Sequence, residues 1–248
     1  MEPLTVLPAD LGPGVRGAFT NRAGGVSVGP HAGLDLALHV GDHPGAVREN
    51  RALLAAWAGA PVRFARQVHG TTVVRVPQEG EAVEEAAAEP EADALVTSHV
   101  GVPLGVLVAD CLPVLLADAR AGVAAVAHAG RRGLLAGVLL RVVEAMAALG
   151  ARPGGIRACV GPAAGGCCYE VPADMLEEAV AAVPELGATT TWGTPSLDLR
   201  AGAVAQLRDL GVAAVTTAGG CTIEDASFYS YRRSRQTGRF AGVVVLAP

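Results

Sequence analysis

Two histidines and one cysteine stand where apolar segments of the sequence end. These residues are His69, Cys111 and His128, and each is followed within two residues by a glycine or a proline. Because strand ends in a layered fold meet at one rim, we expect the three side chains to lie close together. Two imidazoles and one thiolate are a donor set that zinc prefers, and three protein ligands leave a fourth position free for water or substrate. The sequence therefore predicts a metal site that the fold assembles, of the catalytic rather than the structural kind.

Each of these residues also has a plainer interpretation. A histidine at a strand end is often a hydrogen-bonded structural residue, and a buried cysteine is often a small hydrophobic one. Asp110, beside Cys111, is a turn residue, an acid–base group or a carboxylate that orients a histidine ligand. Arg22 precedes paired glycines in "NRAGG", which would suit binding of an anion, or it is a solvated loop arginine. Both interpretations of each residue stay open from sequence alone.

Three further groups of polar residues have weaker patterns, and we expect each to be structural first. Adjacent cysteines rarely chelate one metal together, a short basic loop is often simply solvated, and glycine and proline near charged residues favour a turn. The groups are Cys167 and Cys168 of "GCCYE"; Arg232, Arg233 and Arg239 of "SYRRSRQTGR"; and His39, Asp42 and His43 of "HVGDHP".

The composition favours a globular protein with an aliphatic core. Of the 248 residues, 51 % are hydrophobic, 17 % charged and 4 % aromatic, and the net charge is −5. Without a long basic run we expect no nucleic-acid partner. The first residues lack a basic flank with an apolar run, and the apolar stretch Val100–Leu116 is interrupted, so we expect neither a secretory signal nor a membrane span. An odd number of cysteines, five, then favours reduced thiols and a cytoplasmic location.

Short apolar runs and helical spacings alternate irregularly along the chain. Strands are predicted at Asp93–Ser98, Pro103–Ala109, Pro113–Ala117, Gly122–His128 and Ile156–Val160, with one or two more within 62–76. Another strand, followed by a glycine turn, is predicted within 16–27, and closing strands are predicted within 212–222 and 240–248. Helices are predicted at Pro44–Gly59, Gly133–Leu149, from about Asp174, and at Leu197–Leu210. The acidic segment 79–94 is a solvated connector or a short frayed helix. Hairpins mixed with helices favour an α+β or mixed-sheet layered sandwich over a Rossmann fold.

The motifs resemble, in order, those of the laccase-domain family. They are "FTNRAGGVS", "LHVGD", "RENR", "QVHG", "ADALVT", "VADCLPVLLAD", "AHAGRRG", "GPAAGGCCYEV", "CT" and "FYSYRR…TGR". That family was long labelled multicopper polyphenol oxidase and is now regarded as purine nucleoside phosphorylases with adenosine deaminase activity. The resemblance covers about Arg16 to Val245, and "QVHG", "ADC" and "HAG.RG" together are specific.

The resemblance implies a zinc site on His69, Cys111 and His128, with copper as a possible occupant, and a single α/β/β/α domain over residues 1–248. It also implies that Arg22 takes part in activity. The substrates would be purine nucleosides and inorganic phosphate, with no nucleic-acid or membrane partner. The sequence departs from the family's usual residues at Asp35, Arg131 and Gly166, of which the first two could alter the walls of a pocket.

The expected activity is zinc-dependent phosphorolysis of adenosine, inosine, guanosine or methylthioadenosine, together with deamination of adenosine. Arg22 would contact phosphate, Cys111 would hold the metal beside the reacting atoms, and Asp110 would serve proton transfer. One alternative is copper-dependent oxidation of phenols, although six histidines are few for several coppers. A second is a Cys–His hydrolase or amidase acting on a cell-wall precursor, with Cys111 as nucleophile. The third is a structural zinc protein that acts through a partner.

Overall fold

One half of the molecule is built on a four-stranded antiparallel sheet. The computed structural model describes residues 4–77 and 89–247. In spatial order the strands are β1 (Val6–Ala9), β2 (Val15–Thr20), β12 (Phe240–Leu246) and β5 (Leu104–Val108). All neighbours in this sheet run antiparallel, so both ends of the described chain are joined in one sheet.

The second sheet has six strands and mixed directions. Its spatial order is β11 (Ala214–Thr217), β8 (Arg157–Val160), β6 (Leu112–Asp118), β7 (Val123–Ala129), β4 (Ala94–Thr97) and β3 (Val73–Arg75). The pairs at the two edges are parallel and the inner pairs antiparallel. Every residue of β4, β6 and β7 is buried, because the sheet is covered on both faces.

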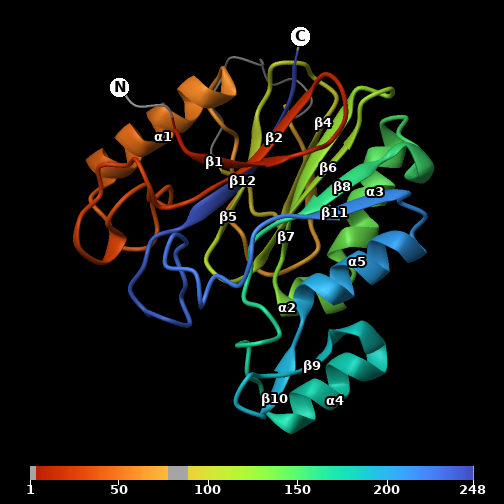
Figure 1. The fold of residues 1–248 in the computed structure, drawn as a ribbon. Coiled ribbons are helices and arrows are strands. Elements are labelled where there is room, and N and C mark those ends of the chain that lie inside the picture. Colours follow the sequence, from red (N-terminus) through yellow and green to blue (C-terminus); the bar gives the residue numbers. More distant parts are fainter. Residues whose placement is uncertain (1–3, 78–88, 248) are drawn as a thin grey trace.

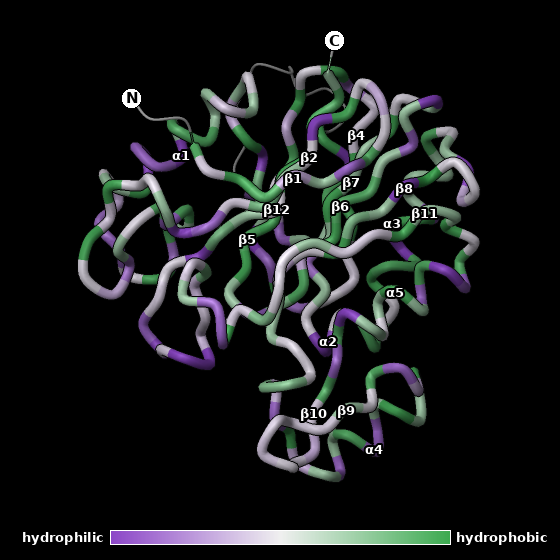
Figure 2. The backbone as a smooth tube through the Cα atoms, viewed as in Figure 1, coloured by the Kyte–Doolittle hydropathy of each residue, from purple (hydrophilic) through white to green (hydrophobic). Residues whose placement is uncertain are grey.

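Helices cover the outer faces of the two sheets (Figure 1). Helix α1 (Pro44–Ala58) packs on the four-stranded sheet through Leu54, which lies in one core cluster with Leu107 and Val243. Helices α3 (Val138–Ala148) and α5 (Leu199–Asp209) cover the six-stranded sheet. A third core lies between the sheets, where Figure 2 shows apolar strands face to face. The α+β, α/β/β/α arrangement in a single domain is therefore confirmed.

Shorter elements complete the fold. Helix α4 (Ala173–Ala182) and the hairpin of β9 (Gly187–Thr189) and β10 (Pro195–Leu197) form the lobe at the bottom of Figure 1. The remaining helices are α2 (Arg131–Leu135) and the 3₁₀ turns Gly29–His31, Pro153–Gly155 and Pro184–Leu186. Within the described ranges, no helix has both the length and the apolar character needed to cross a membrane.

Several predicted elements differ from the structure. The helix predicted at Gly133–Leu149 is two helices, α2 and α3, because Gly137 adopts φ +90° between them. The helix predicted from Leu197 begins at Leu199, since the Asp198 carboxylate accepts a hydrogen bond from the Ala201 amide and caps it. Of the segment 62–76, strand β3 and two isolated bridges are observed. The acidic connector predicted at 79–94 lies mostly outside the described residues.

Candidate metal centre

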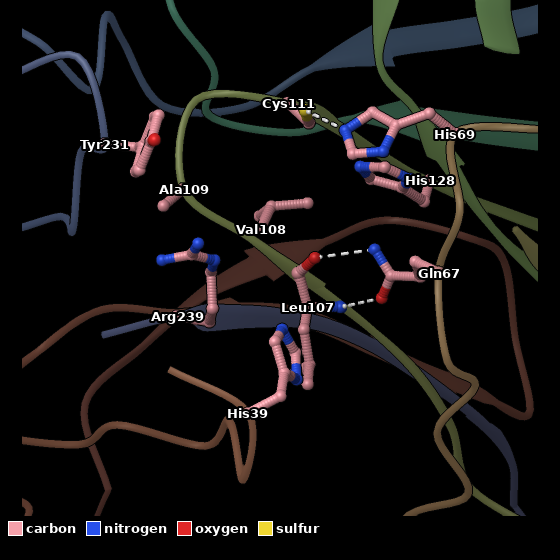
Figure 3. Close-up of a pocket in the computed structure, with 10 residues that line it drawn as sticks. All are labelled: His39, Gln67, His69, Leu107, Val108, Ala109, Cys111, His128, Tyr231 and Arg239. Atoms are coloured by element: carbon pink, nitrogen blue, oxygen red, sulfur yellow. Dashed lines mark hydrogen bonds between the residues drawn. The ribbon is translucent and has the colours of Figure 1, made fainter. Parts of the chain in front are cut away.

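The structure brings His69, Cys111 and His128 together. Their ligand atoms all lie within 4.8 Å of one another. The Cys111 Sγ to His69 Nε2 distance is 3.7 Å, and the two imidazole rings meet edge to face with centroids 4.8 Å apart. In a tetrahedral zinc site, bonds of about 2.3 Å to sulfur and about 2.0 Å to nitrogen separate the donors by roughly 3.6 Å. The donor types and spacings therefore fit a single metal ion, on the side of the pocket shown at the upper right of Figure 3.

Three different chain segments carry these donors. Cys111 lies where the chain crosses from β5 in one sheet to β6 in the other, and Asp110 makes the sharp turn there with φ +87°. His128 is within β7, one residue before its end. His69 lies in the irregular segment before β3, with φ +61°. The crossing explains why an acid and a thiol interrupt two apolar strands.

Asp93 joins the two histidines and is fully buried. Its Oδ1 accepts hydrogen bonds of 2.8 Å from both His128 Nδ1 and the His69 amide, and its Oδ2 accepts one of 2.6 Å from the Gly70 amide. Because Nδ1 of His128 is the donor to this carboxylate, Nε2 is the nitrogen that faces a metal. The unusual backbone of His69 is held by the same carboxylate. The sequence pattern did not indicate this role, although Asp93 stands at the start of an apolar strand.

The charges of the site favour a thiolate. Burial raises the pKa of Cys111, but the charge and hydrogen bonds of His128 and His69 outweigh it and lower the pKa to about 6. Burial lowers the pKa of His128, but Cys111 and Asp93 outweigh it and raise the pKa to about 9. In the absence of a cation, Cys111 and His128 therefore form a thiolate–imidazolium pair. A divalent cation would take the place of the imidazolium proton.

Two glycines of "AHAGRRG" allow the segments to approach. A Cβ atom on Gly130 would lie 2.8 Å from His69 Cδ2 and 3.2 Å from Cys111 Sγ. A Cβ atom on Gly133 would lie 2.9 Å from the Gly70 carbonyl oxygen. Glycine is therefore required sterically where this loop passes under the candidate ligands.

The Asp110 carboxylate accepts hydrogen bonds that hold the turn, and its hydrogen-bond partners are not histidines. Its Oδ1 accepts a hydrogen bond of 2.7 Å from the Thr222 hydroxyl, and its Oδ2 accepts one of 2.6 Å from the Arg232 amide. The contact with a candidate histidine ligand that the sequence suggested for Asp110 is made by Asp93 instead. Asp110 holds Cys111 in place through the backbone, and its role in proton transfer stays a prediction.

Arg22 is not among the residues that line the pocket of the three candidate donors. Its guanidinium donates to the Ala32 carbonyl oxygen and stacks on Tyr229, with 5.2 Å from Cζ to the ring centroid. Arg239 lines the pocket instead, and its Nη1 donates to the carbonyl oxygens of Thr237 and Gly238. Of the two arginines, Arg239 is therefore the one placed to meet an anion in this pocket.

The pocket has a volume of about 360 Å³, within the range of small-molecule sites. Gln67 forms part of its wall, because its side-chain amide exchanges two 2.8 Å hydrogen bonds with the backbone of Leu107 (Figure 3). Burial is the main cause that lowers the pKa of His39, which is therefore neutral at pH 7. The lining residues are His39, Gln67, His69, Leu107, Val108, Ala109, Cys111, His128, Tyr231 and Arg239.

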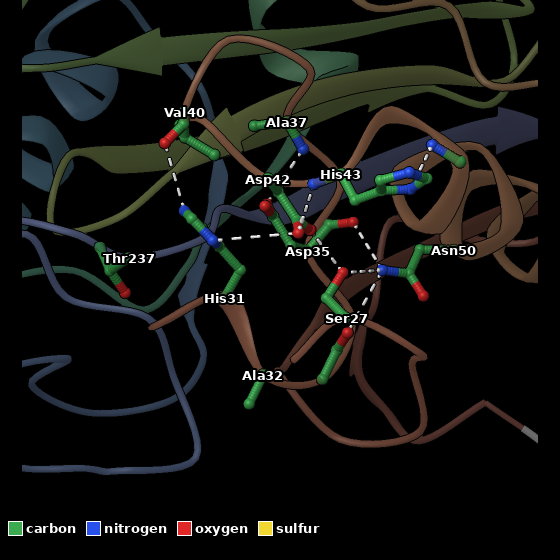
Figure 4. A network of polar contacts seen from close by, with 12 residues as sticks. Ser27, His31, Ala32, Asp35, Ala37, Val40, Asp42, His43, Asn50 and Thr237 are labelled. Carbon is green, nitrogen blue, oxygen red and sulfur yellow. Dashed lines mark hydrogen bonds and ion pairs between the residues drawn. The ribbon is translucent and has the colours of Figure 1, made fainter. Parts of the chain in front are cut away.

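A polar network that includes Ser27, Asp35 and Asn50 (Figure 4) is joined to the pocket by a hydrogen bond from the Arg239 amide to Asp35. Asp35 accepts hydrogen bonds at Oδ1 from the amides of Arg239 and Ala37, and burial raises its pKa. His43 accepts from the Gly45 amide and so caps α1, while Asp42 accepts from the His43 amide. The expectation of turn chemistry for Asp42 and His43 is confirmed, whereas His39 of the same segment reaches the pocket.

The chain is similar to proteins of known name and structure. A curated relative from Mycobacterium tuberculosis called purine nucleoside phosphorylase is 48 % identical over 233 residues, which are 93 % of this chain and 91 % of the relative. A second relative with this name, from Streptomyces coelicolor, is 50 % identical over 238 residues, which are 94 % of this chain and 96 % of the relative. A crystal structure from Neisseria meningitidis superposes with a TM-score of 0.88 at 36 % identity and covers 100 % of both chains. The crystal structure of YlmD from Geobacillus stearothermophilus superposes with a TM-score of 0.85 at 32 % sequence identity and covers 95 % of this chain and 93 % of that chain.

The family model described as multi-copper polyphenol oxidoreductase laccase matches residues 16–247. The match includes every donor of the candidate metal centre and both sheets apart from β1 and the first residue of β2. The chain therefore belongs to this laccase-like family.

Proposed function

We propose that this protein is a zinc-dependent purine nucleoside phosphorylase that also deaminates adenosine. The observation that carries the proposal is the convergence of His69, Cys111 and His128 beside a pocket that also holds Arg239. The name shared by relatives 48–50 % identical supports the choice of reaction. Adenosine, inosine, guanosine and methylthioadenosine are the candidate nucleosides, with phosphate as the second substrate.

In this proposal, Arg239 would contact phosphate, and a metal ion bound by the three donors would activate an oxygen. Phosphorolysis places a phosphate dianion beside the anomeric carbon of the nucleoside, and the transition state at that carbon resembles an oxocarbenium ion. Arg239 would bind phosphate through the guanidinium nitrogens that do not donate to Thr237 and Gly238. A bound zinc ion would supply Lewis-acid activation of an oxygen on phosphate or of a water molecule. Asp93 holds the His128 tautomer that such an ion requires.

A panel of nucleosides, with and without phosphate, tests the reaction by following free base and ammonia separately. Release of base that requires phosphate supports phosphorolysis, and ammonia from adenosine supports deamination. Cys111→Ala and His128→Ala should lose both the metal and phosphorolysis of inosine. Cys159→Ala, in the core between the sheets, is the matched control. A folded Cys111→Ala protein that lacks metal and still cleaves inosine would refute the metal-dependent mechanism.

A second candidate function is favoured by one observation. Asp93, His128 and Cys111 have the order of acid, base and nucleophile found in cysteine hydrolases, and the pKa of Cys111 is lowered to about 6. Such a hydrolase would be an amidase that acts on a cell-wall precursor. Rapid alkylation of Cys111 in protein that retains its metal would favour this reaction, because a metal-bound thiolate is shielded.

Copper-dependent oxidation of phenols is the third candidate. Sulfur and imidazole donors bind copper readily, but neither of the two donor groups in the described part of the chain contains more than two histidines. Metal analysis of protein produced without added copper, together with oxygen uptake, separates a native copper centre from adventitious copper.

A further inference from the structure

A second group of metal-binding side chains lies away from the pocket. It consists of Cys167, Cys168, Cys221 and Glu224, whose sulfur and carboxylate oxygen atoms all lie within 4.8 Å of one another. None of the three cysteines is in a disulfide. The sequence predicted packing or a single auxiliary role for the adjacent cysteines, but a third sulfur and a carboxylate reach the same point. We propose that this thiol cluster binds one thiophilic divalent cation, with zinc as the natural occupant.

The distances within the thiol cluster match those around a tetrahedral ion. Cys167 Sγ lies 3.3 Å from Glu224 Oε2. With bonds of about 2.3 Å to sulfur and about 2.0–2.2 Å to oxygen, zinc would place these two atoms roughly 3.6 Å apart, and two sulfurs roughly 3.8 Å apart. A small outward movement therefore makes room for the ion. Four protein donors fill the coordination shell, which is typical of a structural site.

The backbone brings the four donors together before any ion is bound. Ala163 and Cys221 form an isolated parallel bridge, and the Thr222 amide donates to the Ala163 carbonyl oxygen at 3.0 Å. The Gly165 amide donates to Cys221 Sγ at 3.3 Å, the kind of outer contact that stabilises a metal-bound thiolate. A Cβ atom on Gly165 would lie 3.2 Å from Cys167 Sγ. The absence of a side chain at Gly165 thus leaves space for the sulfurs.

The thiol cluster brings three thiols and one carboxylate, all of them acidic groups, to a single point. Burial raises the pKa of Cys167, and the neighbouring thiols and Glu224 raise it further. Burial likewise raises the pKa of Cys168; its hydrogen bond with Cys167 lowers it, and Cys221 and Glu224 raise it. Thiolates are unfavourable there because the groups around them are acidic. A divalent cation would offset this repulsion, and the thiol protons would pass to solvent as it binds.

The thiol cluster is connected to the first centre through the turn that carries Cys111. Thr222, next to Cys221, donates through its hydroxyl to Asp110 Oδ1 at 2.7 Å. Ala164, in the same loop as Cys167, donates through its amide to the Asp110 carbonyl oxygen at 2.9 Å. An ion in the thiol cluster would clamp the two loops that hold Asp110. The proposed role of the ion is therefore to keep the turn at Asp110, and with it Cys111, in place.

Cobalt binding to the full chain tests the proposal. In the Cys111→Ala background, which disables the first centre, the reduced protein should bind one Co²⁺ with a strong thiolate charge-transfer absorption band. Adding Cys221→Ser should weaken the band, because only two of the three thiolates remain, and should weaken zinc binding by at least about a hundredfold, since ligand loss costs more than an outer-contact change. Adding Cys159→Ala instead should change neither, because Cys159 lies in the core between the sheets.

A milder variant keeps the test decisive if Cys221→Ser does not fold. Glu224 is exposed, so Glu224→Gln should fold normally, keep the charge-transfer band and bind zinc about tenfold more weakly. The proposal is overturned if the Cys111→Ala protein shows no thiolate band, or if Cys221→Ser changes neither the band nor the zinc affinity. It is also overturned if mass spectrometry of unreduced protein finds two of these cysteines joined in a disulfide and the reduced protein binds no cobalt.

Discussion

Asp93→Asn is the substitution that most directly tests how the candidate metal centre is held. The wild-type carboxylate accepts from His128 Nδ1 and the His69 amide at Oδ1, and from the Gly70 amide at Oδ2. An asparagine has one oxygen and one NH₂ group for these positions. If NH₂ replaces Oδ2, it opposes the Gly70 amide at 2.6 Å. If NH₂ replaces Oδ1, His128 must accept at Nδ1 and carry its proton on Nε2, which then cannot bind a metal.

Both orientations have a cost that follows from these contacts. Each leaves at least one backbone amide without its acceptor and sets donor against donor, which destabilises the fold by about 2–4 kcal/mol. A domain with about 5–15 kcal/mol of stability still folds. Substitution of a partner that orients a histidine ligand lowers metal affinity about tenfold to a hundredfold. That loss corresponds to about 1.4–2.8 kcal/mol of binding free energy.

The assay is a zinc titration in competition with a chromophoric chelator, with urea unfolding of the metal-free protein beside it. Asp118→Asn is the matched control, because Asp118 is also buried and accepts from three backbone amides, those of Arg120, Ala121 and Arg152, but contacts no candidate ligand. It should lose comparable stability and keep its zinc affinity. Wild-type zinc affinity in folded Asp93→Asn would refute the reasoning.

Further predictions concern the same pocket. Gly130→Ala should lower zinc affinity at least about tenfold and cost about 1–3 kcal/mol of stability, because the added methyl group would press on His69 and Cys111. Calorimetry measures the zinc affinity, and urea unfolding measures the stability. In metal-free protein the rate of alkylation of Cys111 should fall to half near pH 6 as pH decreases, because its lowered pKa keeps the thiolate present above that pH; zinc should suppress alkylation. Arg239→Met should raise the KM for phosphate roughly tenfold to a hundredfold through loss of charged hydrogen bonds, in a phosphate titration with inosine fixed.

The donors of the metal centre could be predicted because they are reactive side chains that interrupt apolar runs. A thiol between β5 and β6 has no packing role that the sequence suggests, so it indicated chemistry. Asp93 could not be found in this way, because its importance depends on hydrogen bonds from the amides of residues 68–70 and from the His128 imidazole, which only the fold brings to it. Arg22 is a different case: a glycine-rich turn suggested an anion site, and in the structure its Nε and Nη2 donate to the Ala32 carbonyl oxygen, so its role in activity stays a prediction.

The fold was predictable where strands are buried on both faces. Strands β4 to β7 have continuous apolar runs, and their bounds agree with the predicted ones within a few residues. Strand β1 and the β9–β10 hairpin were missed, since they are short and partly exposed and so lack a strong apolar pattern. The break at Gly137 was missed as well, because an isolated glycine within an apolar helical pattern is compatible with a continuous helix.

His69 separates the metal-dependent mechanism from a nucleophilic cysteine. A triad of Cys111, His128 and Asp93 is complete without His69, whereas a three-ligand metal centre is not. Because His69 is exposed, His69→Ala should leave the fold intact, and its loss should cost most of the zinc affinity and phosphorolysis together. A nucleophilic mechanism instead requires that His69→Ala retain activity, with Cys111 still alkylated readily near pH 7. If His69→Ala keeps full phosphorolysis without bound zinc, the His69 imidazole has only a packing role and Cys111 is the nucleophile.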